Sequence, residues 1–147
     1  THTYADKVAA IKNAQAVGLA VCSGGIMGLG ESWENRIDMA LALRDLGIKS
    51  VPVNVLNAIP GTPLAENPPL SEDEVKRIVA IYRFILPDAS IRMAGGRGLF
   101  ADKGRALFSS GANAAISGDM LTTYGINTAT DLDMLRTMGY KAVKCHD

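Results

Sequence analysis

Apolar and polar positions along the chain follow two periods that alternate. Apolar residues recur three or four positions apart, as on one face of a helix, over residues 4–17, 32–46 and 72–86. Two more helices are expected over 101–110 and 129–139. Short apolar runs typical of buried strands stand between them, at residues 19–23, 50–56, 90–94 and 114–118. Strands spaced by helices in this way predict an α/β fold with parallel strands and right-handed crossovers.

Four such strands have two interpretations on the residues alone. One is a small open three-layer sandwich, and the other is half of an eight-stranded (β/α) barrel of the TIM type, which needs about 250 residues when complete. Both architectures keep their sites at the C-terminal ends of the strands, where the longest loops of this chain are expected. With 147 residues, the chain is expected to form a single domain, residues 1–147.

The composition narrows the class of function. Apolar residues make up 48% of the chain, and 15 basic residues balance 15 acidic ones, so no basic face for nucleic acid is expected. No apolar stretch approaches the roughly 20 residues needed to cross a membrane. The two cysteines lie 123 positions apart, at 22 and 145, and do not suggest a disulfide framework. A reducing, cytoplasmic location is therefore expected.

Polar residues interrupt the expected strands on one face only. Alternate residues of a strand share a face, which places Cys22, Asn54 and Arg92 together, each near the C-terminal end of its expected strand. The opposite face is apolar, with Val51, Val53 and other aliphatic residues. A parallel sheet that is buried on both sides usually carries apolar residues on both of its faces. Departures gathered on one face therefore point to a functional site there.

Each of these residues also has a purely structural interpretation. A cysteine at a strand end is commonly a small buried hydrophobe, Arg92 could pair with a structural carboxylate, and Asn54 could bind loop backbone. The glycine-rich stretch VCSGGIMGLGES, residues 21–32, lacks the lysine of a P-loop and the spacing of a dinucleotide loop. The chain has no C-x-x-C or H-E-x-x-H pattern for a metal. The residues alone leave these alternatives open.

Four motifs nevertheless carry a specific resemblance. The stretches VCSGGIMGLGE, SVPVNVL followed by GTPLAEN, IRMAGGR and SGANAAISGDMLTT occur in this order between residues 21 and 123. Together they resemble the C-terminal half of biotin synthase, and the resemblance extends over about residues 4–138. That family consists of radical S-adenosylmethionine (SAM) enzymes with a (β/α)8 barrel. The resemblance therefore implies a parallel half-barrel of about four βα units.

The resemblance also implies roles for individual residues. Cys22 and Arg92 would be ligands of a [2Fe-2S] cluster inside the barrel. The G-x-I-x-G-x-x-E pattern of the SAM loop corresponds here to four residues, with the isoleucine packing on the adenine: Gly24, Ile26, Gly28 and Glu31. Contacts with the substrate dethiobiotin would come from three more: Asn54, Thr122 and Thr123. No catalytic residue is assigned beyond these ligands and contacts.

One part of the family pattern does not occur in this chain. The C-x-x-x-C-x-x-C motif that binds the [4Fe-4S] cluster is absent, so that cluster would belong to the missing half. The parent is expected to insert sulfur into dethiobiotin to make biotin, whereas this chain alone is expected to be inactive. It is also expected to form a homo-oligomer or to associate with the missing half-barrel. Two alternatives are another radical SAM enzyme of related barrel type and a non-catalytic half-barrel assembly module.

Overall fold

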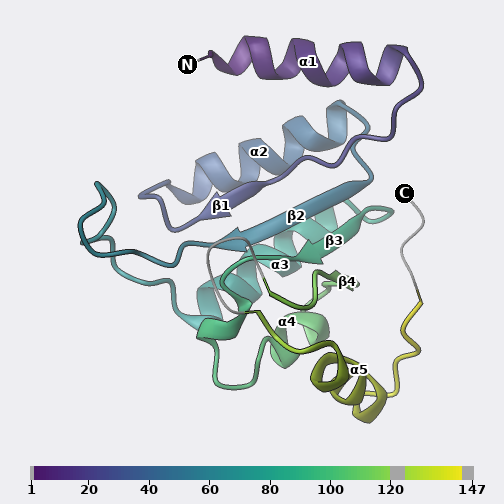
Figure 1. Cartoon of the computed structure of the whole chain (residues 1–147). Helices are drawn as coiled ribbons and strands as arrows, with labels where there is room; N and C mark the ends of the chain where they lie inside the picture. Colours follow the sequence, from purple (N-terminus) through teal and green to yellow (C-terminus); the bar gives the residue numbers. More distant parts are fainter. Residues whose placement is uncertain (1, 120–124, 144–147) are drawn as a thin grey trace.

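The fold is built on a four-stranded parallel sheet. A computed structural model describes residues 2–119 and 125–143. The strands lie in the order in which they occur in the sequence, β1-β2-β3-β4. Their bounds are Gly25–Met27 for β1, Ser50–Val55 for β2, Ser90–Met93 for β3 and Ala114–Ala115 for β4. Every strand thus pairs with its neighbours in sequence, which is the order found in a barrel (Figure 1).

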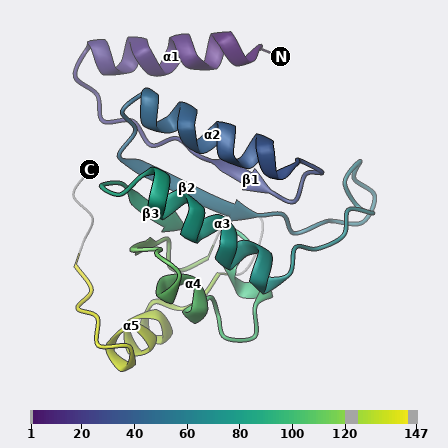
Figure 2. The same ribbon diagram turned by 180° about the vertical axis from the view of Figure 1, so that it is seen from behind.

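The helices between the strands cover one face of the sheet. Seen from behind, α2 (Trp33–Asp45), α3 (Glu72–Ile85) and the short α4 (Arg105–Ser109) lie in front of the strands (Figure 2). A doubly wound sandwich would reverse its strand order and place helices on both faces. Neither feature is present in the described part of the chain, and the half-barrel expected from the resemblance is confirmed.

Two further helices lie at the margins. The first, α1 (Tyr4–Ala16), runs above α2 beyond the β1 edge and buries none of its residues, whereas α5 (Thr128–Thr137) lies below β4 (Figure 1). A 3-10 turn, η1 (Arg97–Leu99), follows β3. Within residues 2–119 and 125–143, none of the helices has both the length and the apolar content that a membrane crossing requires.

The core lies between the sheet and the helices. Burial alternates along β2 and β3, so every second side chain faces the helices. Helix α3 presents four buried residues at the spacing of one helical face, namely Val75, Ile78, Val79 and Tyr82. They pack with the buried strand residues Val51, Val53, Val55, Ile91 and Met93. The apolar face expected from the sequence is thus the covered one.

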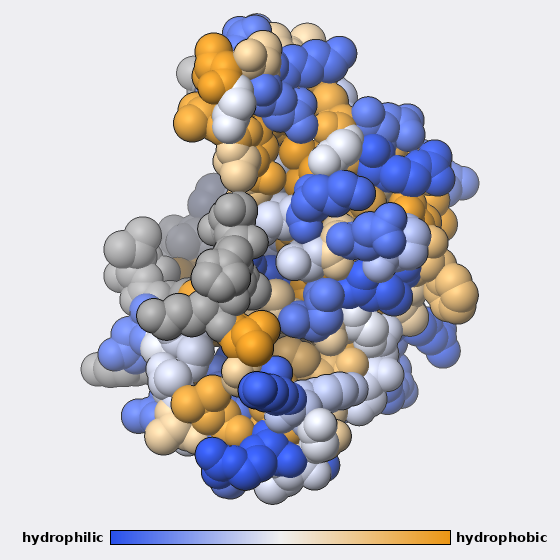
Figure 3. All heavy atoms as spheres, turned by 90° about the vertical axis from the view of Figure 1, so that its right-hand side faces the viewer, coloured by the Kyte–Doolittle hydropathy of each residue, from blue (hydrophilic) through white to orange (hydrophobic). Residues whose placement is uncertain are grey.

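The other face of the sheet is not covered by any described helix. Figure 3 views the molecule from the right-hand side of Figure 1 and shows it hollowed on the side of this face, below α1. We call this surface the open face; it carries the partly buried side chains of Ser50, Pro52, Asn54, Ser90 and Arg92. The residues that the sequence analysis singled out therefore lie where the sheet is accessible.

The helix starts follow local signals in the sequence. The expected capping box of Ser71 and Glu74 is present, because the serine side chain accepts the Glu74 amide and the glutamate accepts the Ser71 amide. Ser32 caps α2 in the same way, with Asn35 as its partner. Both starts are confirmed as expected.

Three expected elements differ from the structure. The strand expected at 19–23 is instead β1 at Gly25–Met27, because only Cys22 of that run forms a bridge with β2. The helix expected over 101–110 begins at Arg105, since the Asp102 carboxylate accepts the amides of Gly104 and Ala106 and so fixes a later start. The strand expected at 114–118 is limited to its first two residues.

A buried ion pair fixes α5 to the rest of the domain. Arg97, just after β3, donates two hydrogen bonds to the Asp131 carboxylate, at 2.7 and 2.6 Å. Arg97 is 2% exposed and Asp131 is 5% exposed. The guanidinium also donates to the carbonyl oxygens of Lys103 and Ile116. The pair therefore joins η1, the start of α4, the end of β4 and α5.

We expect the change Asp131→Asn to destabilise the domain by about 3 kcal/mol, because it leaves a buried guanidinium without its counter-charge. Urea unfolding followed by circular dichroism measures this loss. Asp133→Asn is the matched control on the same helix, since its pair with Arg136 is exposed, and it should change the free energy of unfolding by less than about 0.5 kcal/mol. Equal losses in the two variants would contradict the assignment.

Candidate functional site

The register of the sheet places the candidate residues in rows across the open face. Ile26 pairs with Asn54, Pro52 pairs with Arg92, and Cys22 forms a parallel bridge with Ser50. The offset between β1 and β2 is the same at Cys22 and at Ile26, so no bulge intervenes. Cys22, Asn54 and Arg92 therefore share one face of the sheet, as the alternation of residues predicted.

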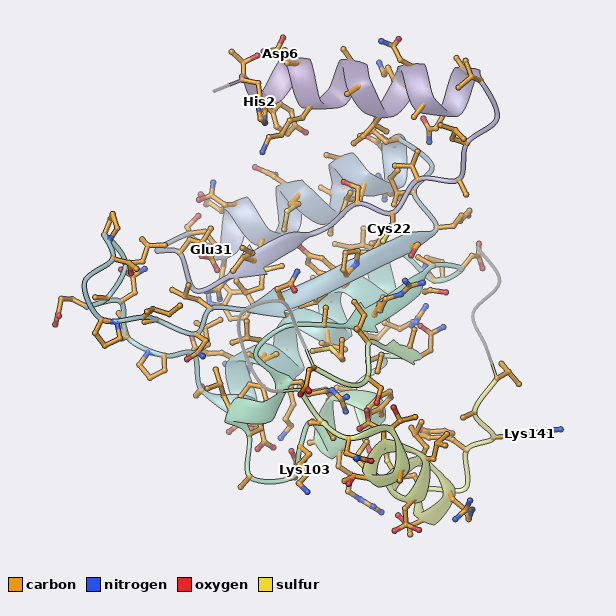
Figure 4. The ribbon with its side chains drawn as sticks, viewed as in Figure 1. His2, Asp6, Cys22, Glu31, Lys103 and Lys141 are labelled. Atoms are coloured by element: carbon orange, nitrogen blue, oxygen red, sulfur yellow. The ribbon has the colours of Figure 1, made fainter. Side chains whose placement is uncertain are left out.

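Their positions along the strands differ from the prediction for one of the three. Cys22 faces Ser50, the first residue of β2, so it lies at the N-terminal end of the sheet and not at a C-terminal strand end. Figure 4 shows Cys22 and Glu31 at opposite ends of β1. The prediction failed because the strand begins at Gly25, inside the glycine-rich stretch that had suggested a loop.

Glycines are needed there because the neighbouring backbone is close. A side chain at Gly24 would overlap the carbonyl of Pro52 on β2. Gly28 has a φ of +100°, a conformation that residues with a side chain rarely adopt. The atoms that exclude a side chain at Gly24 thus belong to the sheet itself.

Cys22 is a free, exposed cysteine with one polar neighbour. The Ser50 hydroxyl donates a hydrogen bond to its sulfur over 3.2 Å. A pocket of about 400 Å³ opens beside it, lined also by Lys49 and Asp88 at the N-terminal ends of the strands. The thiol is therefore accessible to a ligand approaching the open face.

Arg92 faces a different hollow. It lines a pocket of about 730 Å³ together with residues of β4 and α5, among them Asp131 and Leu135. In the sheet register, Arg92 lies two strands away from Cys22 and two residues further along the strand direction. With ordinary strand spacing and rise per residue, the Cα atoms of Cys22 and Arg92 are about 12 Å apart. The structure thus brings the two residues onto one face but not into one pocket.

The part of the chain that the structure describes does not contain a full donor set for an iron–sulfur cluster. Such clusters are held mainly by cysteine thiolates. Within residues 2–119 and 125–143, no three His, Cys, Asp or Glu side chains are grouped so that they could hold a metal ion. Cys22 and Arg92 lie on one face of the sheet, and further ligands for a shared cluster would have to face them from other strands.

Asn54 has a structural role in addition to its place on the open face. Its amide nitrogen donates to the Gly25 carbonyl at 3.2 Å, and its oxygen accepts the Gly95 amide at 2.9 Å. The side chain therefore links β1 to the turn after β3, as the structural interpretation of the sequence anticipated. One N–H and one lone pair remain for another partner.

Ile26 is 48% exposed although it lies in a strand. Its exposed side chain stands beside Asn54, with which it is paired in register. An apolar side chain left on the accessible face of a sheet is suited to pack against a flat apolar ligand surface. This is the position that the resemblance assigned to the adenine contact.

Glu31 holds the turn that follows β1. Its carboxylate accepts the amides of Gly28, at 2.9 and 3.0 Å, and of Leu29, at 2.7 Å, and pairs with the Arg36 guanidinium at 2.7 Å. Partial burial raises the pKa of Glu31, but the hydrogen bonds from Gly28 and Arg36 outweigh burial and leave the pKa below its ordinary 4.5. Glu31 thus acts on the protein backbone, while Gly24, Ile26 and Gly28 lie along the strand that it terminates.

Thr122 and Thr123, which the resemblance assigned to the substrate carboxylate, lie outside the described residues. The segment before them ends at Asp119, whose carboxylate accepts the Gly125 amide at 3.2 Å. Gly118 in turn donates to the Ile126 carbonyl at 2.8 Å.

Comparison with known families identifies the domain. Residues 52–141 match the model of the Biotin and Thiamin Synthesis associated domain. The chain belongs to this family. The matched region contains Asn54 and Arg92, whereas Cys22 and the glycine-rich stretch precede it.

Curated relatives extend the match to almost the whole chain. The protein named Biotin synthase of Brachyspira hyodysenteriae is 64% identical over 141 residues, which cover 96% of this chain and 42% of the relative. Biotin synthase 2 of Corynebacterium diphtheriae is 57% identical over 146 residues, covering 99% and 44%. The chain therefore spans less than half the length of these relatives. The resemblance to the C-terminal half of biotin synthase is confirmed.

A solved structure supports the architecture. The crystal structure of methylornithine synthase (PylB) aligns with a TM-score of 0.78 over 97% of this chain and 46% of that one, at 20% sequence identity. At this identity the likeness shows the fold alone. The aligned region makes up 46% of that solved structure.

Two residues that hold the site, Arg36 and Asn67, were not among those predicted from the sequence. Arg36 is 6% exposed, lies over the Trp33 ring at 4.7 Å and pairs with Glu31. Asn67 donates to the Gly28 carbonyl at 2.9 Å. A charged residue one helical turn after the Ser32 cap was a signal for Arg36. No local pattern marks Asn67, which is 39 positions from Gly28.

We expect Glu31→Gln to destabilise the domain by about 2 kcal/mol at pH 7, because Arg36 loses its counter-charge and an acceptor of backbone amides is lost. The folded pKa lies below 4.5, so the contribution of the carboxylate is complete above that pH and is lost as the pH falls through the folded pKa. The difference from the wild type should therefore shrink below about pH 4.5. Urea unfolding at several pH values measures it.

Glu34→Gln is the control for this prediction, because Glu34 is an exposed carboxylate in the first turn of the same helix. A pH-independent loss in Glu31→Gln, or an equal loss in Glu34→Gln, would show that the carboxylate does not hold the turn as described.

Proposed function

We propose that this domain is the C-terminal half of a biotin synthase, whose whole enzyme inserts sulfur into dethiobiotin by radical SAM chemistry. The observation that carries the proposal is the open face. Cys22, Asn54 and Arg92 share it, and the chain is 64% identical to a biotin synthase over nearly its whole length. A sulfur-inserting enzyme requires metal ligands and substrate contacts on a common surface.

In this proposal Cys22 and Arg92 are ligands of a [2Fe-2S] cluster, which supplies the sulfur when bound. The exposed thiol can bind iron as a thiolate, and the Ser50 hydroxyl is placed to donate to its sulfur. Arg92 lies on the same face, on β3, and its planar guanidinium would supply a nitrogen ligand. The chain's own part is to hold these two groups at a fixed separation.

The SAM contacts are assigned to the strand end. Ile26 would pack on the adenine with its exposed side chain. Gly24 would contribute by letting this segment lie close to β2, and Gly28 by permitting the turn that follows Ile26 and Met27. Glu31 would act indirectly, by fixing the amides of Gly28 and Leu29. In this motif, some residues would then contact SAM directly, such as Ile26, and others would only hold the backbone in place, such as Glu31.

Dethiobiotin contacts are assigned to Asn54, Thr122 and Thr123. Asn54 retains one N–H after its bonds to Gly25 and Gly95, and that N–H is available to a substrate carbonyl. The threonine hydroxyl groups would donate hydrogen bonds to the substrate carboxylate.

A cytoplasmic location belongs to the same proposal. It is supported by two cysteines that lie too far apart in the sequence to suggest a disulfide framework.

The chain alone should not cleave SAM, because the motif that binds the [4Fe-4S] cluster does not occur in it. A reconstituted enzyme can be made by joining the unmatched part of the Brachyspira hyodysenteriae relative to this chain. We expect 5′-deoxyadenosine and biotin from the reconstituted enzyme under anaerobic reduction, and neither product from the chain alone.

In the reconstituted enzyme, Cys22→Ala should lower biotin formation at least about 100-fold while SAM cleavage continues, since outer-sphere losses at metal sites already reach 10- to 100-fold. Ser23→Ala is the control at the next position, which faces away from Cys22. Chromatography of both products separates the two reactions. Biotin formation by the Cys22→Ala enzyme at the wild-type level would exclude Cys22 as a ligand.

The missing half is also the proposed partner of the open face. In the described part of the chain, β1 and β4 each have a strand neighbour on one side only. Unpaired strand edges and an accessible sheet face favour association. In the whole enzyme the remaining strands would complete the barrel, and in isolation a second copy of the chain could take their place.

Sedimentation tests this expectation on the isolated chain. At micromolar concentration we expect species of at least twice the 15.5 kDa chain mass. Adding the separately produced N-terminal part should replace them with a complex of one copy of each. A stable monomer of 15.5 kDa that forms no complex with the N-terminal part would show that the half-barrel is stable without a partner.

A further inference from the structure

The peptide group between Gly28 and Leu29 is held from both sides by side chains of different segments. Its N–H, from Leu29, donates to the Glu31 carboxylate at 2.7 Å. Its carbonyl, from Gly28, accepts a hydrogen bond from the Asn67 side chain at 2.9 Å. Both polar ends of one peptide plane are thus fixed, one by the start of α2 and the other by the loop after β2.

This peptide needs such restraint more than most. Gly28 and Gly30 both have φ values of +100°, and glycine passes between backbone conformations at low cost. A rotation of the 28–29 peptide plane would break both hydrogen bonds and would redirect the end of β1. Without Asn67, only the hydrogen bond from the Leu29 N–H to Glu31 would still restrain this peptide.

Asn67 is itself presented by a stiff loop. The loop contains Pro60, Pro63, Pro68 and Pro69, whose rings fix φ. Consecutive turns close it, with Thr62 bonded to Ile59, Ala65 to Thr62 and Asn67 to Leu64 through their backbones. Leu70, at its end, lies close to Gly28. The loop therefore carries Asn67 to the Gly28 carbonyl at a small entropic cost.

We propose that Asn67 is a positioning residue for the adenosyl group, acting through the Gly28–Leu29 peptide to fix the strand end that carries Ile26. The proposal rests on the proposed function for the identity of the ligand. The hydrogen bond also connects the family-matched region, which starts at residue 52, to the glycine-rich stretch before it. The loop after β2 would thereby contribute to SAM affinity without touching SAM.

The restraint can be tested on the chain itself, without a ligand. Asn67→Asp keeps the shape of the side chain but replaces the N–H donor by a carboxylate oxygen facing the Gly28 carbonyl. We expect the Leu29 amide to exchange with solvent about fivefold faster, corresponding to the loss of one hydrogen bond of about 1 kcal/mol. Asn57→Asp, at an exposed position of the same loop, should leave that rate within about twofold.

The effect on the ligand is measured in the reconstituted enzyme with S-adenosylhomocysteine as an unreactive probe. Asn67→Asp should raise its dissociation constant about tenfold, and Asn67→Ala, which adds no repulsion, about fivefold. The dissociation constant of dethiobiotin should stay within about twofold of the wild-type value. A general loss of structure would instead weaken the binding of both ligands. Asn57→Asp should match the wild type for both.

The outcomes separate this proposal from the proposed function. Unchanged Leu29 exchange in Asn67→Asp, or faster exchange with unchanged probe affinity, would overturn the positioning role while leaving the proposed function intact. Equal weakening of both ligands would also overturn it. If the wild-type reconstituted enzyme does not bind the probe, the proposed function fails and the adenosyl role fails with it, whereas the exchange result still decides whether Asn67 holds the peptide.

Discussion

The rest of the structure depends on one constraint, that every described crossover of the parallel sheet returns on the same side. Right-handed crossovers in an unreversed strand order place α2, α3 and α4 on one face. Residues that point to that side must be apolar, which explains the buried series Val51, Val53 and Val55 on β2. Residues that point the other way are not covered by α2, α3 or α4. Cys22, Asn54 and Arg92 can be polar because of this asymmetry.

The same constraint explains which parts of the site could be predicted from the sequence. Alternation of residues along a strand identifies a face even when the bounds of the strand are wrong. The first strand was expected at 19–23 and lies at Gly25–Met27, yet Cys22 was assigned to the correct face. The backbone stays extended from Cys22 to Ile26 with one offset to β2, so the parity of the positions is preserved.

Position along the strand and long-range contacts were not predictable in this way. Glycines suggest a loop by their propensity, and only the close approach of Pro52 shows that Gly24 serves a strand. Arg97 and Asp131 are 34 positions apart, and Asn67 and Gly28 are 39 apart. Neither pair leaves a local pattern. Asp102 shows a further case, because its carboxylate competes for amides that a helix from 101 would have used.

Asn54 shows that structural and functional interpretations of one residue need not exclude each other. A side-chain amide has four hydrogen-bonding positions, and the backbone of Gly25 and Gly95 uses two of them. Those two bonds fix the orientation of the amide and so determine where its remaining N–H points. A substrate bound there would meet a donor that is already immobilised, at little further cost in conformational entropy.

The proposed cluster would need ligands from beyond this half-barrel, and the geometry of a barrel explains why. A closed barrel surrounds its interior, so ligands for one cluster can come from strands on opposite sides. Four strands supply only one side, and here that side offers Cys22 and Arg92 about 12 Å apart between their Cα atoms. In the proposed function the chain would therefore form one wall of a site. The sheet fixes Cys22 and Arg92 in relation to one another, and the further ligands would come from strands that stand opposite them.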